Sequence, residues 1–392
     1  MYPNYPALSV GPQASPAVAT ALQQRLTALL APLLTTLDAH LDKRLVRTFL
    51  ATIVVLLQWR YGAHGLLLSE LGAYLIDPAH APAGTKRLSN LLRSRKWSPL
   101  LIEHFLWQQA NQRVQALEQA DEEVLVVWDE SVLEKPESTA LEGLGPVRSS
   151  KAARLLRIKP GYYHPPCRKV VVPGINWLGL LVTGRSGPPT LAAMRWWPTR
   201  GPLAQDRRQL EARLLRRCRA AWGPRVLHLF DRGFAGSPWL GTLLRERVRF
   251  VLRWNSSYPL MDATGHLQRP GAFVVRRRSW EHRLIPDAQR RQWCKVGVLA
   301  RQVWHPDYPE QPLWLVVARP GKGQKPWYLL TNEPVPDAAA VWRIVLAYAR
   351  RWQIEQAWRF NKSDLVMESP RLWKAVNRRK FLLLVSWPTR SC

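Results

Sequence analysis

Two short apolar runs, each followed directly by an aspartate, constrain the fold most strongly. Val124–Trp128 leads into Asp129, and Val226–Phe230 leads into Asp231. A short continuous apolar run is typical of a central strand that is buried on both faces. An amphipathic helix is expected at about 205–221, before the second run. Strands followed by a helix and another strand predict a mixed α/β sheet, and adjacent strands would bring the two acids side by side.

The segment before this sheet has a helical pattern throughout. Residues 1–16 contain several prolines and are expected to be a flexible N-terminus, and residues 17–120 an all-α domain. A basic helix in this domain is expected to read DNA, and its candidate contact residues are Lys86, Arg87, Arg93, Arg95 and Lys96. A basic helix that only faces solvent is nearly as compatible with this pattern.

The sheet is expected to be interrupted. Residues 121–250 are expected to form the first part of the core, and residues 251–336 read as antiparallel strands between Pro, Gly and Asp turns, without helices. One of these strands is expected at 271–277. Residues 337–392 would then hold a long helix and a short C-terminal helix at about 371–385. The chain thus reads as an α/β core with an N-terminal all-α domain and a β-rich insertion.

The helix after the insertion carries the most specific pattern of the chain. Tyr348, Arg351, Glu355 and Lys362 lie at roughly 0°, 300°, 340° and 320° around a helix axis, within an arc of about 60°. Asp337 supplies an N-cap signal for this helix. One face would present a carboxylate, two cations and a phenol, which suits a metal ion and nearby phosphates. A solvated basic helix is the alternative, but the aromatic residues Trp342, Trp352, Trp358 and Phe360 argue against it.

The charge balance indicates an anionic partner. The chain has 57 Lys and Arg against 28 Asp and Glu, a net charge of +29 and a pI near 10.9, which favours nucleic acid. With 392 residues and 47% hydrophobic composition it can bury a sizeable core, unlike a short histone-like chain. The four cysteines show no zinc-ligand or disulfide spacing, and no signal peptide or membrane span is recognised. These features favour the cytoplasm and exclude a membrane partner.

The acids are the candidates for chemistry. Asp129, Asp231 and Glu355 together would supply the hard oxygen ligands that magnesium prefers. Two such ions can activate one oxygen and stabilise another during displacement at phosphorus. Either aspartate alone is weak evidence, because Asp129 could cap a turn and Asp231 could pair with the next residue. Glu130 and Glu134 are rivals of Asp129, but strand alternation points Glu130 to the other face and Glu134 is expected beyond the strand.

With Asp129, the Asp231-Arg-Gly-Phe234 turn and the Tyr348, Arg351, Glu355, Lys362 pattern in order, the chain resembles a DDE transposase of the bacterial insertion-sequence class with the YREK signature. The resemblance covers about residues 120–365. It implies an RNase H-like core with a β-rich insertion, and two Mg²⁺ ions, or Mn²⁺, held by the three acids. It also implies that Tyr348, Arg351 and Lys362 grip phosphates near the transposon end.

The resemblance further implies partners and a location. Terminal inverted repeats and target DNA would be the substrates of a homodimer in the DNA complex, in a bacterial, nucleoid-associated cytoplasmic protein. Relatives place a tryptophan of the insertion on a flipped base, and the candidates here are Trp254, Trp280, Trp293 and Trp304. For each of these tryptophans, a place in the core is the better reading.

Three functions remain open at this stage. The first is a magnesium-dependent transposase that cleaves strands at transposon ends and transfers them to target DNA. The second is an RNase H-like DNA nuclease without strand transfer. The third is a catalytically inactive basic DNA-binding protein from a truncated copy. Only 30 residues follow Lys362, whereas many relatives continue with a further helical segment.

Overall fold

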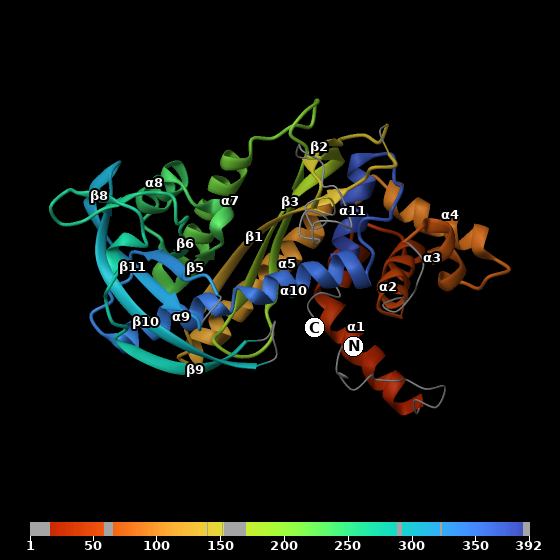
Figure 1. Ribbon diagram of the computed structural model, residues 1–392. Helices are drawn as coiled ribbons and strands as arrows, with labels where there is room; N and C mark the ends of the chain where they lie inside the picture. The colour runs from red at the N-terminus through yellow and green to blue at the C-terminus, as the bar shows by residue number, and fades with distance from the viewer. Residues whose placement is uncertain are drawn as a thin grey trace.

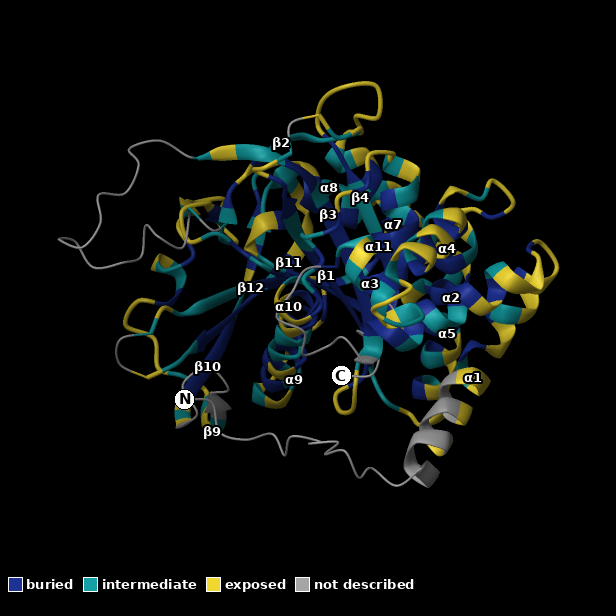
Figure 2. Ribbon diagram, turned by 90° about the vertical axis from the view of Figure 1, so that its right-hand side faces the viewer, coloured by how far each residue is buried: buried dark blue, intermediate teal, exposed yellow. Residues whose placement is uncertain are grey.

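A computed structural model describes residues 16–58, 66–138, 140–150, 152, 170–287, 292–321 and 324–386. Helices from both ends of the chain gather at one end of the molecule, and a long mixed sheet extends from them to the other end (Figure 1). The most deeply buried residues follow the central strands of this sheet (Figure 2). Within the described residues, no helix is long and apolar enough to cross a membrane.

The N-terminal helical region is built from α1 (Pro16–Asp38), α2 (Lys43–Gln58), α3 (Leu68–Leu75), α4 (Ala81–Arg93) and α5 (Pro99–Gln119). Helices α3 and α4 approach closely where Gly72 meets Gly84, because a Cβ atom on Gly84 would lie 2.1 Å from the Gly72 carbonyl oxygen. The C-terminal helix α11 (Ala375–Ser386) joins the same unit. Its Lys380 Nζ donates to the Ser94 carbonyl oxygen, at 2.7 Å, just beyond the end of α4.

The core sheet has the strand order β4–β3–β1–β5–β6. Its strands are β1 (Val124–Glu134), β3 (Val171–Thr183), β4 (Thr190–Trp197), β5 (Val226–Phe230) and β6 (Arg249–Arg253). The first three form antiparallel pairs, whereas β1, β5 and β6 run parallel. This mixed sheet behind a helical N-terminal region confirms the expected mixed α/β core with an N-terminal helical domain.

Helices cover both faces of the core. Leu214 of α7 (Arg207–Trp222) and Leu240 of α8 (Ser237–Arg245) belong to the same apolar cluster as Trp128 and Phe230. The intervening strand residues, such as Val127 and Leu229, pack in the other cluster with α9 (Ala338–Ala349) and α10 (Trp352–Arg359). Side chains alternate between faces along a strand. Asp129 and Asp231 therefore fall on the face covered by α9 and α10.

The β-rich insertion extends the core sheet and is continuous with it. It contains β7 (Leu260–Met261), β8 (Leu267–Gln268), β9 (Glu281–Asp287), β10 (Gln292–His305), β11 (Tyr308–Arg319) and β12 (Trp327–Thr331). Strand β12 pairs with β6, so the boundary expected at 250/251 falls inside a strand of the core. The prediction of a strand at 271–277 is wrong. A 3₁₀ turn, η4 (Ala272–Val274), closes there with a bond from Val274 N to Gly271 O of 3.2 Å.

Short elements complete the chain. They are β2 (Gly145–Arg148), which pairs with β3, the 3₁₀ turns η2 (Gly223–Arg225) and η3 (Arg232–Phe234), and the π-helical segment η5 (Phe360–Asp364). The helix expected at 205–221 is α7, and the C-terminal helix expected at 371–385 is the shorter α11. Because η5 directly follows α10, it sets the end of the helix that carries the most specific motif.

Candidate active site

Asp129 and Asp231 are delivered side by side by neighbouring strands. Trp128 and Phe230 are the last partners in the parallel pairing of β1 with β5, and each is followed directly by an aspartate. Adjacent strands lie about 4.8 Å apart, so these acids are close neighbours. The sequence placed Asp129 at the end of its strand, whereas β1 continues to Glu134 in antiparallel pairing with β3.

Glu355 reaches the same place from the facing helix. Asp337 caps α9 by accepting a bond of 2.8 Å from Ala340 N, as the sequence predicted. The single helix expected across the motif is broken, however. Arg351 N donates to Tyr348 O at 3.0 Å, an i to i−3 bond that separates α9 from α10. A 3₁₀ turn and a following π segment within one helix are associated with functional sites.

A glycine allows α10 to lie close to the sheet beside Asp129. Gly179 of β3 is the register partner of Asp129, and a Cβ atom there would lie 2.0 Å from the Trp358 ring. Trp358 also packs on Trp177, with ring centroids 4.3 Å apart. These contacts seat α10 against β3 and thereby position Glu355 over the paired aspartates.

Arg351 lies between two of the three acids. Its Nη2 pairs with Glu355, and its Nη1 lies 3.8 Å from Asp129 Oδ1. Burial and the negative charges of Asp231 and Glu355 raise the pKa of Asp129 to about 8, although Arg351 opposes this shift. Burial disfavours the charged form of Arg351, but its neighbours Tyr348, Glu355 and Asp129 raise its pKa. Three mutually repelling carboxylates are thus balanced by one buried guanidinium.

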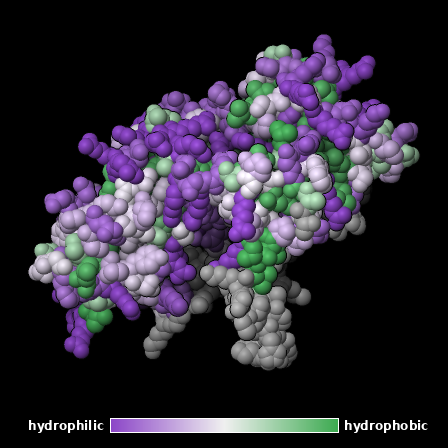
Figure 3. All heavy atoms as spheres, turned by 90° about the horizontal axis from the view of Figure 1, so that it is seen from above, coloured by the Kyte–Doolittle hydropathy of each residue, from purple (hydrophilic) through white to green (hydrophobic). Residues whose placement is uncertain are grey.

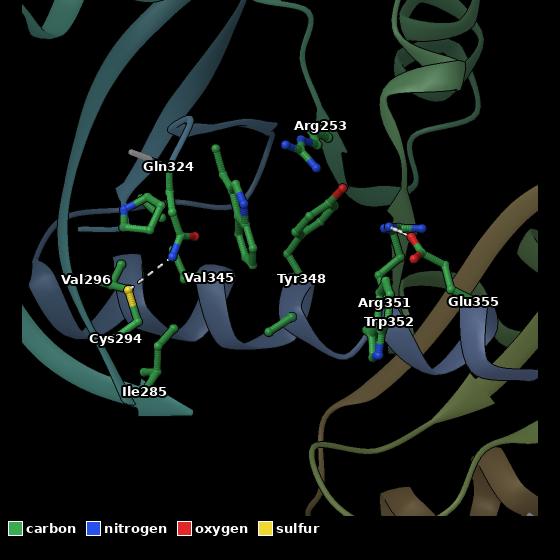
Figure 4. A pocket seen from close by; sticks show the side chains of 14 residues that line it. Arg253, Ile285, Cys294, Val296, Gln324, Val345, Tyr348, Arg351, Trp352 and Glu355 are labelled. Atoms are coloured by element: carbon green, nitrogen blue, oxygen red, sulfur yellow. Dashed lines mark hydrogen bonds and ion pairs between the residues drawn. The ribbon is translucent and has the colours of Figure 1, made fainter. Parts of the chain in front are cut away.

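The motif residues open onto a cavity of about 410 Å³ between α9–α10 and the insertion strands (Figure 4). Tyr348, Arg351 and Glu355 line one side, and Cys294 and Val296 of β10 line another. The Tyr348 hydroxyl and the Arg351 Nε and Nη1 atoms are buried without a hydrogen-bond partner within the described chain. Burial also raises the pKa of Tyr348. Two of the residues that line the cavity therefore carry buried hydrogen-bond donors that are not satisfied within the described chain.

Several lining residues were not singled out from the sequence. Arg253 at the end of β6, Trp327 of β12 and Trp352 of α10 all line the cavity. Trp327 packs on Tyr348, with ring centroids 5.5 Å apart. Trp352 could have been identified from the sequence, because it directly follows Arg351 of the motif. Arg253 and Trp327 come together only through the pairing of β6 with β12.

Lys362 and Asp231 are not among the residues that line the cavity. Lys362 is half-buried within the π segment η5 rather than on a regular helix face. Asp231 Oδ1 accepts a bond of 2.7 Å from Gly233 N, which caps the 3₁₀ turn η3. This cap fixes the aspartate side chain in the place where β5 ends.

The rival acids have other partners. Glu130 Oε1 accepts from Arg207 Nε at 2.6 Å, on the α7 side of the sheet, as strand alternation predicted. Glu134 lies within β1, contrary to expectation. It accepts bonds from Ser149 Oγ at 2.7 Å and from Ser150 N at 2.7 Å. Both glutamates are therefore occupied by structural contacts away from the cavity.

The donor chemistry of Asp129, Asp231 and Glu355 suits a divalent cation. They offer hard oxygens, and their repulsion across a buried site is what a cation would relieve. Among the residues that the structure describes, however, no three His, Cys, Asp or Glu side chains are grouped closely enough to hold one ion. At this site the Arg351 guanidinium pairs with Glu355 and lies close to Asp129.

The cations predicted on the basic helix lie outside this site. Lys86, Arg87 and Arg93 are exposed on α4, and Arg95 and Lys96 are exposed just after its end. Leu88, Leu91 and Leu92 form the opposite, buried face. The helix is therefore amphipathic, with its cations in solvent.

The tryptophans predicted in the insertion differ in exposure. Trp254 is buried and Trp304 is half-buried, whereas Trp280 is 46% exposed and Trp293 is 69% exposed. Trp293 directly precedes Cys294, which lines the cavity, so its side chain points to the other face of β10. The tryptophans at the cavity are Trp327 and Trp352.

Comparisons with known proteins bear on the second half of the chain. Residues 199–385 match the model of the family described as the transposase DDE domain, a range that contains Asp231 and Glu355 but begins after Asp129. No curated protein matches the chain. The cryo-EM structure of the piggyBac transposase synaptic complex with hairpin DNA is 13% identical, with a TM-score of 0.44 over 88% of this chain. The present chain covers 64% of that chain. The family match supports a DDE transposase.

Proposed function

We propose that the protein is a DNA transposase that cleaves strands at transposon ends and transfers them to target DNA. One observation carries the proposal. Asp129 and Asp231 follow the last paired residues of two parallel strands, and both Asp231 and Glu355 of α10 interact electrostatically with Asp129. The match of residues 199–385 to a transposase DDE domain supports this reading.

Asp129, Asp231 and Glu355 would hold the divalent ions, with two Mg²⁺ ions proposed and Mn²⁺ as a substitute. The ions would activate the attacking oxygen and stabilise the leaving oxygen at phosphorus. The protein's own part would be to bring these carboxylates near one another. The strand pairing and the η3 cap would hold Asp129 beside Asp231, and the contact of Trp358 with Gly179 would hold α10, which carries Glu355, against the sheet. Arg351 must release Glu355 for that carboxylate to serve as a ligand.

Tyr348, Arg351 and Lys362 would bind phosphates of the cleaved strand. Tyr348 and Arg351 line the cavity, and the Tyr348 hydroxyl and the Arg351 Nε atom are buried donors without a hydrogen-bond partner among the described residues. Such donors suit phosphate oxygens. The exposed cations on and beside α4 would bind the terminal repeats at the other end of the molecule, since phosphate contacts supply most non-specific affinity.

Glu355→Gln tests the proposal. The substrate is a plasmid that carries the gene between its native flanking sequences, incubated in magnesium. We expect the variant to lose cleavage and to keep DNA affinity, because a ligand oxygen is lost while the basic surface remains. Glu246→Gln, a change of the same kind just after the end of α8, should cleave normally. Normal cleavage by Glu355→Gln would contradict the assignment.

The reaction products separate strand transfer from simple nuclease activity. A transposase joins the freed 3′ end to new DNA, so junctions with unrelated target DNA are expected among the products. Cleavage without any junction would favour an RNase H-like nuclease. Binding with neither cleavage nor junctions would favour an inactive DNA-binding protein.

A further inference from the structure

The sheet of the insertion has two faces with different linings. Cys294 and Val296 of β10 and Ala318 of β11 line the catalytic cavity. The intervening residues Lys295 and Gly297, with Arg319, line a second cleft. Because alternate side chains of a strand point to opposite faces, the second cleft lies on the reverse side of β10–β11 from the cavity.

The reverse cleft is strongly basic. Its volume is about 640 Å³, and its lining includes Arg277, Arg278, His282, Lys295 and Arg319. Among the described residues that line it there is no carboxylate. The side chains of Arg277, Arg278 and Lys295 are exposed. Uncompensated cations gathered in a concave surface attract a polyanion.

The cleft is held in a defined shape. Gly297 of β10 pairs with Arg319 of β11 on one side and with His282 of β9 on the other. Three neighbouring strands therefore each contribute a residue to the cleft. A Cβ atom at Gly297 would lie 2.5 Å from Ser279 Oγ and 2.7 Å from His282 Nε2, so glycine lets both side chains lie close to β10. Arg319 Nη1 donates to the Arg277 carbonyl oxygen at 2.7 Å. This bond connects the segment that carries Arg277 and Arg278 to β11.

Exposed apolar side chains border these cations. Trp293 lies two residues before Lys295 on the same face of β10, and it is 69% exposed. Leu284 of β9 is the register partner of Lys295 and is 63% exposed. Cations that follow a backbone, together with aromatic rings on which bases stack, are the features of a nucleic-acid surface.

We infer that this reverse face binds the sugar–phosphate backbone of a second DNA segment, separate from the one at the catalytic cavity. A straight duplex seated at the cavity cannot also reach the other side of the same strands. The cations of α4 cannot serve the same segment either, because α4 lies at the opposite end of the molecule from β9–β11 (Figure 1). The inference stands on the charge and geometry of the insertion and does not depend on metal chemistry.

The test compares two triple variants of the full chain. Arg277→Gln/Arg278→Gln/Lys295→Gln removes three cations of the cleft, and Arg213→Gln/Arg216→Gln/Arg245→Gln removes three exposed cations of α7 and α8. Each is titrated with a labelled 30-base-pair duplex of random sequence across a salt series. The stoichiometry is measured at low salt, and circular dichroism confirms that both variants fold.

The cleft variant is expected to lose one bound duplex per chain and to bind more weakly. The slope of log affinity against log salt should become shallower by up to about 3, at about 0.9 for each lost phosphate contact. The α7–α8 variant should keep the wild-type stoichiometry. Trp293→Ala should weaken binding of a single-stranded probe about tenfold, within the stacking energy of one base.

Two results would overturn the inference. One is a cleft variant with the slope and stoichiometry of the α7–α8 variant. The other is unchanged DNA binding together with lost binding to phosphatidylserine vesicles, which would assign the cleft to lipid head groups. Failure of plasmid cleavage by the wild-type chain would contradict the proposed function only, since duplex stoichiometry does not require cleavage.

Discussion

At the scale of single residues, Arg351 combines a structural contact with its proposed contact with DNA. The sequence predicts that Arg351 lies beside Glu355 on one helix face, where it could bind DNA or pair with that acid. In the structure Arg351 is 9% exposed, and it pairs with Glu355 and lies near Asp129. Removing one partner of a buried ion pair typically destabilises a protein by about 3–5 kcal/mol. The role of Arg351 in phosphate binding remains a proposal alongside this structural one.

Arg351→Ala is therefore expected to lower the free energy of unfolding by about 3 kcal/mol in metal-free buffer. Mn²⁺ should restore part of that loss, because the ion supplies positive charge to the same carboxylates. The measurement is thermal unfolding with and without Mn²⁺. Arg351→Lys, which keeps the charge, should lose less. A melting temperature of Arg351→Ala equal to that of the wild type would show that the ion pair adds no stability.

His228 predicts a pH dependence of stability. Its Nδ1 accepts from Trp128 Nε1 at 3.0 Å, so the buried ring is neutral. Burial, with a smaller effect of Arg249, lowers the pKa of His228 to about 3. The unfolded chain binds this proton below about pH 6.5, whereas the folded chain does not. The contribution of His228 to stability is therefore lost as pH falls from about 6.5 towards 3, at about 1.4 kcal/mol per pH unit.

His228→Gln should remove this dependence, since the amide oxygen can still accept from Trp128. The free energy of unfolding, measured by urea titration between pH 7 and pH 4.5, should fall less steeply in this variant than in the wild type. His266→Gln, at an exposed histidine, is the matched control and should follow the wild type. Parallel curves for His228→Gln and the wild type would show that His228 binds its proton in the folded state.

At the scale of elements, the seat of α10 on β3 positions Glu355. Gly179→Ala places a methyl group where the Trp358 ring now lies. We expect a loss of about 1–3 kcal/mol of stability from overpacking. Plasmid cleavage should fall further than stability explains, because α10 must move away from the aspartates. Cleavage is measured at a temperature at which both proteins are folded.

A second change distinguishes displacement of α10 from general damage. Trp358→Phe removes part of the ring that would meet a side chain at residue 179. The double variant Gly179→Ala/Trp358→Phe should therefore cleave better than Gly179→Ala alone. The two changes should then be non-additive, as expected for residues in contact. Additive losses would show that Gly179 acts on the site by another route.

Local signals could predict much of the site. The apolar runs identified β1 and β5, the Asp337 cap identified the start of α9, and alternation placed Glu130 correctly. The break between α9 and α10 could not be predicted, because it depends on distant contacts. Arg350 Nε and Nη2 donate to the carbonyl oxygens of Gly184 and Gly187, at 3.1 and 2.6 Å. Periodicity along one helix carries no information about such bonds.

At the scale of the whole molecule, the sheet runs without interruption from the core into the insertion. Hydrophilic residues dominate the face seen from above (Figure 3). The sequence predicts a net charge of +29 but not its distribution. Whether a lysine of β10 faces the catalytic cavity or the reverse cleft follows from strand register, which the insertion pattern alone does not determine. Both ends of the chain also meet in the helical unit, through α11 and α4.

The central claim is that Asp231 binds a divalent ion that is needed for DNA cleavage. Replacing the ligand oxygen of Asp231 tests this claim most directly. Asp231→Cys replaces a hard oxygen with a thiolate, which magnesium binds poorly and softer ions bind well. Plasmid cleavage is measured in Mg²⁺ and in Mn²⁺, with Asp231→Asn as the control. We expect Asp231→Cys to be inactive in Mg²⁺ and to recover activity in Mn²⁺, whereas Asp231→Asn stays inactive in both. Wild-type cleavage by Asp231→Cys in Mg²⁺ would contradict the account.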